Sequence, residues 1–409
     1  MKQFEVPSSY RSNLISAIKQ KRKADDKLKK DFSPTLLDFG PVRFYLARHF
    51  GFCYGVENAI NIAYKTIEEN KGKRIFLLSE MIHNPQVNSD LTQRGVRFLH
   101  DTNGNELISL NTLTNEDIVM IPAFGTTLEL EATIAAKGIQ IEKYNTTCPF
   151  VEKVWNRSEQ IANKGYSIVI HGKPKHEETR ATFSHAAANT PTVIVNDMEE
   201  SILLGKIILG ELPSTDFEKI FVGRYSPGFD IQKDLTKIGV VNQTTQLATD
   251  TQAISDYLKK VIVQKYGAEN IQAHFADTRD TLCYATNDNQ SAVIGLLETP
   301  ADLAIVMGGK NSSNSSHLVE LCEQKLPTYF IDDANKIISK EEILKTNWKN
   351  KETKVVSNYL PNKPVADILM TSGASCPDTV VEASIYKIAS FYKVEGKLEQ
   401  FLNQWTVTE

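Results

Sequence analysis

Three cysteines of this chain stand in closely similar sequence contexts: Gly-Phe-Cys53-Tyr-Gly-Val, Thr-Thr-Cys148-Pro-Phe-Val and Thr-Leu-Cys283-Tyr-Ala-Thr. Each lies close to a hydrophobic or extended run and precedes a stretch with helical character. Domain-sized segments separate them, unlike the paired Cys-x-x-Cys turns of a zinc ribbon. The pattern suits a common centre to which three modules each deliver one thiolate. Three thiolates on an iron–sulfur cluster would leave one iron open for a substrate, so the pattern points to cluster catalysis.

The two remaining cysteines, Cys322 and Cys376, bring the total to five. Cys376 also stands at a predicted strand-to-helix turn, so a four-thiolate zinc site is an alternative. Cys322 lies within a predicted helix, and we expect it in the core because free cysteines behave as small apolar side chains. The same interpretation is open to any other cysteine taken alone. An odd number in a long chain argues against a disulfide framework and favours a reducing cytoplasm.

Two longer polar motifs follow predicted strands. In His171-Gly-Lys-Pro-Lys-His176-Glu-Glu178, histidine and glutamate stand at a helix start, where one could deliver a proton and the helix N-terminus could hold an anion. A helix cap with a solvent-facing His–Glu pair is the alternative. The motif Gly-Gly-Lys-Asn-Ser312-Ser313-Asn314 forms a natural phosphate cradle, although it lacks the Walker A pattern. A polar loop with a helix cap would look the same.

Shorter polar clusters follow other predicted strands: Met81-Ile-His83-Asn-Pro, Asn242-Gln-Thr244-Thr and Ser372-Gly-Ala-Ser375. A lone histidine is more often structural than functional. Taken as a set, one cluster at each strand end predicts the wall of a single central pocket.

Strands alternate with helices from Pro41 onward, which predicts an α/β fold with mainly parallel sheets built from βαβ units. Ligands of such sheets gather at the carboxyl ends of the strands, where the polar motifs stand. The predicted strands span 42–48, 74–79, 117–121, 167–171, 192–195, 238–242, 302–307, 328–331 and 366–371.

The repeat of strand, cysteine and helix predicts three similar modules. We expect boundaries near Cys148 and near Asp277, and a stretch near 211–234 that is a surface insertion because it is rich in Pro, Gly and charge. The charge run over 19–30 predicts a solvated helix. The expected organisation is an N-terminal extension 1–41, a first module 42–147 joined by 377–409, a second module 148–277 and a third module 278–376.

Composition excludes several classes of protein. The 409 residues carry a net charge of −4, which indicates neither nucleic acid nor an acidic membrane as a partner. No apolar run approaches the roughly 20 residues of a membrane span. The opening residues do not resemble a signal peptide, and an organelle transit peptide is disfavoured by Glu5, Asp25 and Asp26.

Taken together, these motifs resemble the 4-hydroxy-3-methylbut-2-enyl diphosphate reductases, the last enzymes of the non-mevalonate isoprenoid route. The resemblance implies three similar α/β domains around a central cavity that holds a [4Fe–4S] cluster on Cys53, Cys148 and Cys283. The matching phrases run in the family's order from about residue 43 to about residue 392: Gly-Phe-Cys53-x-Gly-Val, Ile-His83-Asn, Thr-Cys148-Pro, His176-x-Glu178, Gln243-Thr244-Thr245, Cys283-Tyr-Ala-Thr, Lys310-Asn-Ser-Ser-Asn-Ser315 and Gly373-Ala-Ser375.

The family's activity is the reductive dehydroxylation of (E)-4-hydroxy-3-methylbut-2-enyl diphosphate to isopentenyl and dimethylallyl diphosphate. The resemblance implies Glu178 as the proton source and Thr244 as the residue that orients the substrate hydroxyl. Electrons should come from ferredoxin or flavodoxin, since no Gly-x-Gly-x-x-Gly nucleotide fingerprint occurs in the chain. The diphosphate contacts implied by the resemblance are His83, His176, Ser312, Ser313, Asn314 and Ser375.

The long N-terminal segment and the phrase Pro122-Ala-Phe124-Gly are similar to the longer plant and cyanobacterial branch of the family. Many bacterial members have a histidine that contacts the diphosphate where this chain has Phe124. Cys376 falls where many members carry a small residue, so we do not expect it to be a ligand.

Three rival interpretations remain: a zinc protein, a redox-inert phosphosugar- or nucleotide-binding protein, and an open-iron hydratase.

Overall fold

A computed structural model of the chain describes residues 4–276, 278, 281–398 and 400–401. The chain divides into two compact units. The first comprises Met1–Glu57, Ile82–Ser89 and Tyr284–Glu409, and the second comprises Asn58–Met81 and Asp90–Cys283. The boundary that we predict near Asp277 lies outside the described residues, and the module boundaries stay predictions.

The first unit is built on a five-stranded sheet in the order β1-β2-β13-β9-β10. β1 is antiparallel to β2, and the other neighbours are parallel. Every residue of β9 and β13 is buried, because helices cover both faces of a parallel sheet and its central strands are apolar on both sides. The strands are β1 (Thr35–Asp38), β2 (Val42–Leu46), β9 (Leu303–Met307), β10 (Thr328–Ile331) and β13 (Ala366–Ser372).

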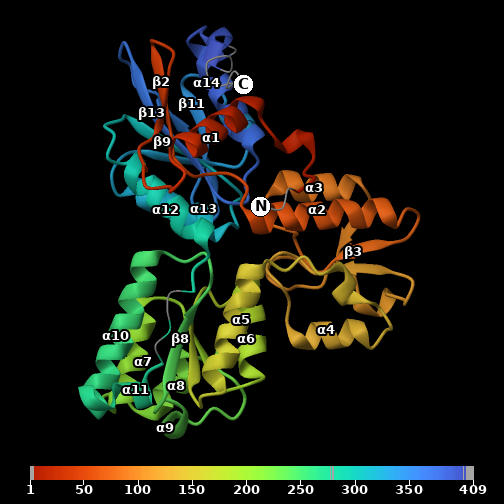
Figure 1. Cartoon of the computed structure of the whole chain (residues 1–409), viewed down its shortest axis with the longest axis vertical. Coiled ribbons are helices and arrows are strands. Elements are labelled where there is room, and N and C mark those ends of the chain that lie inside the picture. The colour runs from red at the N-terminus through yellow and green to blue at the C-terminus, as the bar shows by residue number, and fades with distance from the viewer. Residues whose placement is uncertain (1–3, 277, 279–280, 399, 402–409) are drawn as a thin grey trace. The chain divides into compact units, whose positions relative to one another are not determined.

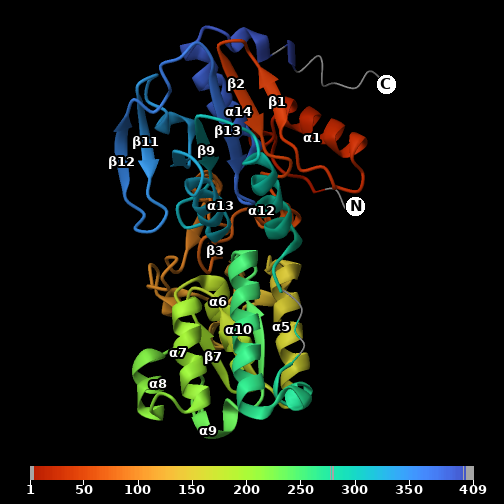
Figure 2. The same ribbon diagram turned by 90° about the vertical axis from the view of Figure 1, so that its left-hand side faces the viewer.

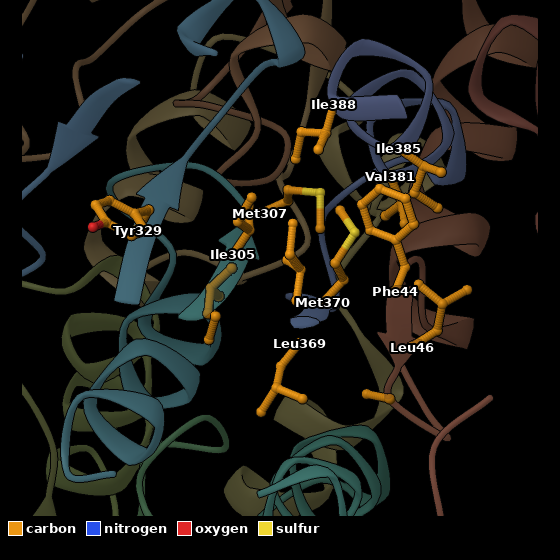
Figure 3. Packing of buried hydrophobic residues seen from close by; sticks show 14 of the residues in the cluster. Phe44, Leu46, Ile305, Met307, Tyr329, Leu369, Met370, Val381, Ile385 and Ile388 are labelled. Carbon is orange, nitrogen blue, oxygen red and sulfur yellow. The ribbon is translucent and has the colours of Figure 1, made fainter. Parts of the chain in front are cut away.

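Successive residues of β13 point to opposite faces of this sheet, as the pleat requires. Figure 3 shows Met370 beside Phe44 and beside Ile385 of α14 (Asp378–Phe391), whereas Leu369 points the other way.

The other helices of the first unit are α1 (Asn13–Asp25), α12 (Tyr284–Leu296) and α13 (Ser313–Glu323); α2 (Tyr54–Glu69) and α3 (Pro85–Gln93) begin in this unit. α1 packs on α14, and α12 packs on α13. Short 3-10 turns span Ser8–Tyr10, Ala334–Lys336 and Glu395–Lys397.

The second unit contains two parallel three-stranded sheets, ordered β7-β6-β8 and β4-β3-β5. In β6, Ile168 and Ile170 pack with residues of α5 and α6, while Val169 between them packs with residues of α7 and α10. Figure 1 shows α5 and α6 on one side of β8 and α7 and α10 on the other. Period-two alternation therefore places one helix pair on each face. The elements are β6 (Ser167–His171), β7 (Thr192–Val195), β8 (Ile238–Asn242), α5 (Pro149–Ala162), α6 (Glu177–Ala187), α7 (Met198–Leu209) and α10 (Ala248–Tyr266).

The smaller sheet of the second unit packs its apolar face on α4 and neighbouring loops. Its elements are β3 (Ile75–Leu77), β4 (Val96–Phe98), β5 (Ile118–Met120) and α4 (Leu128–Ala135). The remaining short helices are α8 (Ser214–Ile220), α9 (Ile231–Asp234), α11 (Ile271–His274) and the 3-10 turns Leu110–Thr112, Ile141–Tyr144 and Ala268–Asn270. In the described part of the chain, no helix is long and apolar enough to cross a membrane.

The predicted α/β class with mainly parallel sheets is confirmed, and the predicted strands coincide with observed ones to within two residues at each end. The surface position predicted for residues 211–234 is wrong for two side chains: Phe217 and Phe221 are fully buried in the core of the second unit. An antiparallel pair that the sequence pattern did not indicate, β11 (Glu342–Thr346) and β12 (Thr353–Ser357), lies in the first unit (Figure 2).

The N-terminal extension is part of the core of the first unit. Leu14, Ile15 and Ile18 of α1 are buried in the same cluster as Phe44, and β1 pairs with β2 at the sheet edge. The charged side chains of the run over 19–25 occupy the rest of α1, where most of them are exposed or half-buried. The extension thus stabilises the first unit directly.

We therefore expect Ile15→Ala to lower the free energy of unfolding by about 2–5 kcal/mol, because it leaves a cavity among buried side chains. Ile15 is 0% exposed. Gln20→Ala, on the exposed face of the same helix, should change stability by less than about 0.5 kcal/mol. Urea unfolding of both variants measures the difference, and equal midpoints would mean that α1 is a dispensable appendage.

Candidate active site

The three matched cysteines occupy equivalent positions in the fold, each at the start of a helix. Cys53 precedes α2, Cys148 is the N-cap residue of α5, and Cys283 precedes α12. All three are half-buried, whereas Cys322 and Cys376 are fully buried. Cys53 belongs to the first unit, and Cys148 and Cys283 belong to the second. The common centre that they are predicted to form stays a prediction.

Two opposing influences act on the thiol of Cys53. Burial raises the pKa of its thiol, while the backbone N–H groups of Val56 and Gly55 at the start of α2 oppose this shift by favouring the thiolate. A bound metal would supply the rest of the stabilisation that the thiolate needs, because a coordinating thiol is deprotonated. The loop that carries Cys53 is held in place by a hydrogen bond, since the backbone N–H of Cys53 donates to the carbonyl oxygen of Ala374 at 3.1 Å.

The other two cysteines are core residues. Cys322 and Cys376 are 0% exposed within the apolar cluster of the first unit. Burial raises the pKa of Cys322 to about 12 and also raises that of Cys376. The core position predicted for Cys322 is confirmed. For Cys376, complete burial in apolar surroundings argues against the four-thiolate zinc alternative, because a ligand must be a thiolate.

In the first unit, a polar cradle follows the carboxyl end of β9. Ser312 is the N-cap of α13, and its Oγ accepts hydrogen bonds from the backbone N–H of Ser315 and from Ser315 Oγ. Ser313 Oγ and Asn314 Nδ2 are buried and have no hydrogen-bond partner among the described residues. A buried donor without a partner costs roughly 1–3 kcal/mol. These two donors therefore indicate a place for a polar ligand.

The side-chain amide of Asn314 is held in one orientation. Its Oδ1 accepts from the backbone N–H of Ala374 at 2.9 Å and from Asn289 Nδ2 at 3.4 Å. With the oxygen occupied, the amino group is the end left for a ligand. The same Ala374 receives the Cys53 N–H at its carbonyl oxygen, so the cradle and the cysteine loop share one support.

The loop after β13 and the His83 loop complete this group. Ser375 Oγ donates to the carbonyl oxygen of His83 at 3.3 Å, and both residues are buried. Gly309 lies so close to His83 that an added Cβ would collide with the His83 carbonyl oxygen. The structure therefore brings together five of the predicted diphosphate contacts in the first unit: His83, Ser312, Ser313, Asn314 and Ser375.

We expect Gly309→Ala to displace the His83 loop, because the obstructing atom is backbone and cannot rotate away. A misplaced binding group should lower kcat/KM at least about tenfold. Gly396→Ala is the matched control, since no atom lies within 4 Å of its added Cβ. Steady-state kinetics of both variants measure kcat/KM, and an unchanged kcat/KM in Gly309→Ala would show that the position of the His83 loop does not affect substrate binding.

The second unit brings the predicted acid into contact with the Gln-Thr-Thr loop. Glu178, in the first turn of α6, is 2% exposed, and its Oε1 accepts the backbone N–H of Thr244 at 2.5 Å. The carbonyl oxygen of Thr244 in turn accepts the N–H of Cys283 at 3.1 Å. One residue thus ties the carboxylate to a cysteine loop, which places the carboxyl group close to that proposed ligand.

Gln243 is a positioning residue that the prediction of site residues missed. Its Oε1 accepts hydrogen bonds from Thr179 Oγ1, the backbone N–H of Lys173 and Gln246 Nε2, and its Nε2 donates to Thr245. It is 1% exposed. These bonds hold the β6 loop, the start of α6 and the Thr244 loop together. Its position next to Thr244 in the sequence is the signal that could have identified Gln243 as a site residue.

His176 is the N-cap of α6, and its ring orientation is fixed. Nδ1 accepts the backbone N–H of Glu178 at 3.2 Å, so in the neutral ring the proton is on Nε2. The ring of Phe124 meets that of His176 edge-on, with centroids 5.6 Å apart. Phe124 therefore supports the histidine that is predicted to contact the diphosphate, rather than supplying a polar contact of its own.

Comparisons with known proteins show the family to which the chain is similar. The family model described as LytB protein matches residues 44–389. A 4-hydroxy-3-methylbut-2-enyl diphosphate reductase from a Cyanothece species is 39% identical over 351 residues, covering 85% of this chain and 84% of that protein. One from Prochlorococcus marinus is 36% identical over 384 residues, covering 94% and 91%. The expected likeness to cyanobacterial members is confirmed.

Among solved structures, the E-1-hydroxy-2-methyl-but-2-enyl-4-diphosphate reductase from Plasmodium falciparum has a similar fold. Its TM-score is 0.60 at 22% identity, with 85% of this chain and 87% of that chain covered. The fold and the polar strand ends define an α/β protein with polar loops at the carboxyl edges of parallel sheets. The chain belongs to the LytB protein family.

Proposed function

We propose that the chain is a reductase that converts (E)-4-hydroxy-3-methylbut-2-enyl diphosphate to isopentenyl and dimethylallyl diphosphate. The substrate takes up two electrons and two protons, its C–O bond breaks, and the hydroxyl group leaves as water. The observation that carries the proposal is the pair of buried donors without partners, Ser313 Oγ and Asn314 Nδ2. The names of the relatives supply the substrate.

The diphosphate would bind through hydroxyl, amide and imidazole donors. Ser312 Oγ already accepts two hydrogen bonds, so its own hydrogen can be donated. The anion also gains from the N-terminus of α13, where the helix dipole favours negative charge. His83, Ser375 and His176 would add further donors. Together these groups replace the hydrogen bonds that the diphosphate makes to water.

Cys53, Cys148 and Cys283 would hold a [4Fe–4S] cluster, as the position of each half-buried thiol at a helix start supports. When bound, such a group supplies single electrons and an open iron that acts as a Lewis acid. The protein would shield the cluster from water. We also propose the three-module organisation, with one cysteine from each module.

Glu178 would supply a proton at the hydroxymethyl end of the substrate. Its hydrogen bond from the Thr244 backbone N–H fixes the position of one oxygen of the carboxyl group. Thr244 would orient the substrate hydroxyl with its own side chain. A positioned carboxylic acid typically contributes about 10²–10⁴-fold to a rate.

Electrons would come from a separate carrier, ferredoxin or flavodoxin, delivered one at a time. The chain contains no nicotinamide or flavin fingerprint of the Gly-x-Gly-x-x-Gly type. Five cysteines without a disulfide suit a reducing compartment, and we propose the cytoplasm.

The test is anaerobic turnover with a reduced viologen dye, on protein whose iron and sulfide have been counted. We expect dye oxidation together with release of both five-carbon diphosphates. Protein that carries a cluster but returns a hydrated product without oxidising dye would instead be an open-iron hydratase. Substrate binding without iron, sulfide or turnover would identify a redox-inert phosphate-binding protein.

A further inference from the structure

A cavity of about 430 Å³ opens in the first unit beside Cys53. Its wall combines lysines of the N-terminal extension with aromatic rings at the starts of α2 and α12. We call it the basic hollow and define it by Lys23, Lys27, Lys29, Tyr54 and Tyr284, all of which line it together with Cys53. The roles proposed above do not involve its lysines or its tyrosines.

Positive charge is concentrated in the basic hollow. Five lysine or arginine side chains line it, against two carboxylates, Glu57 and Asp288. The chain as a whole carries a net charge of −4, so this is a local excess. Lys29 is paired with Asp288 at 2.8 Å. Lys23 and Lys27 are exposed and form no ion pair with any residue that the structure describes.

The floor of the basic hollow is aromatic. The backbone N–H of Tyr54 donates to Tyr284 Oη at 3.2 Å, and Phe4 packs edge-on against Tyr54 with centroids 4.9 Å apart. Tyr284 is 39% exposed, and Lys29 Nζ lies 5.6 Å from the centre of its ring. Tyr54 follows Cys53 in the chain, and Tyr284 follows Cys283. The floor is therefore joined directly to two proposed cluster ligands.

We propose that the basic hollow is the docking surface for a small acidic one-electron carrier protein. This inference rests on the proposed reductase function and adds the place where electrons enter. A cationic rim attracts an acidic partner and fixes its orientation. The exposed ring of Tyr284 gives the two surfaces an apolar contact from which water is excluded. Each docking oxidises the carrier by one electron and reduces the enzyme by one, so two dockings serve one turnover.

The N-terminal extension thereby acquires a second role. α1 and the segment after it supply Lys23, Lys27 and Lys29, while the buried face of the same helix stabilises the first unit. The family model that matches the chain begins only at residue 44. The lysines of the rim thus come from a part of the chain outside the match, which suits a surface adapted to a particular partner.

The experiment uses the holoenzyme and a plant-type ferredoxin as the acidic carrier. The double variant Lys23→Glu/Lys27→Glu reverses the rim, and Lys71→Glu/Lys73→Glu makes the same charge change at exposed positions beyond the other end of α2. Calorimetry gives the Kd for ferredoxin, and reduced viologen gives turnover that needs no docking. We expect the Kd of the rim variant to rise at least about tenfold at low salt and that of the control by less than about twofold.

Viologen turnover should be unchanged in both variants, which separates docking from chemistry. Lys23→Gln/Lys27→Gln removes the two positive charges without adding negative ones, so it disturbs the C-terminal end of α1 less than the glutamate variant does. If the effect is one of charge, its Kd should lie between those of the wild type and the glutamate variant. An unchanged Kd in the rim variant, or equal losses in rim and control variants, would overturn the proposal. Wild-type protein that binds ferredoxin but does not turn over viologen with substrate would refute the reductase function and leave docking intact.

Discussion

Glu178→Gln is expected to reduce turnover of the diphosphate substrate by about 10²–10⁴-fold, the range for loss of a positioned acid. Glutamine has the same shape, and its side-chain oxygen can still accept the Thr244 N–H that Glu178 Oε1 accepts now. The Thr244 loop and the Cys283 loop behind it should therefore stay in place. What the variant loses is the ability to donate a carboxylic proton.

The matched control is Glu177→Gln, the same change one residue earlier in the first turn of α6. It removes the same charge from the same helix end but leaves the Thr244 hydrogen bond untouched, so it should retain most of the activity. Both proteins are assayed with reduced viologen after iron and sulfide have been counted. A Glu178→Gln enzyme with near-normal turnover and a full cluster would remove this residue from proton delivery.

The sequence indicated most of the polar residues at the carboxyl edge of the first unit's sheet, because the signals there are local. Buried parallel strands read as short apolar runs, and the polar residues follow where each run ends. That reasoning located Ser312 after β9 and Ser375 after β13. It could not show that Asn314 offers its amino group, since the orientation depends on Ala374 and Asn289, which are distant in the chain.

Other features were hidden because they depend on tertiary packing. The segment 211–234 is rich in turn-forming and charged residues, yet Phe217 and Phe221 are buried. The charge run over 19–30 indicated a solvated helix, but it did not show that Leu14, Ile15 and Ile18, which precede the run in α1, belong to the core. Local composition reports which residues can tolerate water, and it does not report which neighbours are available to bury the rest.

The largest effect is expected from replacing the matched cysteines. Cys53→Ser, Cys148→Ser and Cys283→Ser should each lose iron, sulfide and visible absorbance, and with them all measurable reductase activity. Serine keeps the size of the side chain but is a poor ligand for iron at neutral pH, because the thiolate is the soft donor that Fe–S clusters select. None of the three replaced side chains is part of the buried core, so the fold should survive.

Cys322→Ser and Cys376→Ser give the opposite pattern and make the test specific. Each places a hydroxyl group in a fully buried apolar site, which should cost roughly 1–3 kcal/mol of stability. The iron and sulfide content of the folded protein should be unchanged. Unfolding measurements and metal analysis on all five variants therefore separate the two classes of cysteine. Loss of iron from fully folded Cys376→Ser would support a four-thiolate site. Retention of iron in Cys53→Ser would contradict the proposed three-cysteine centre.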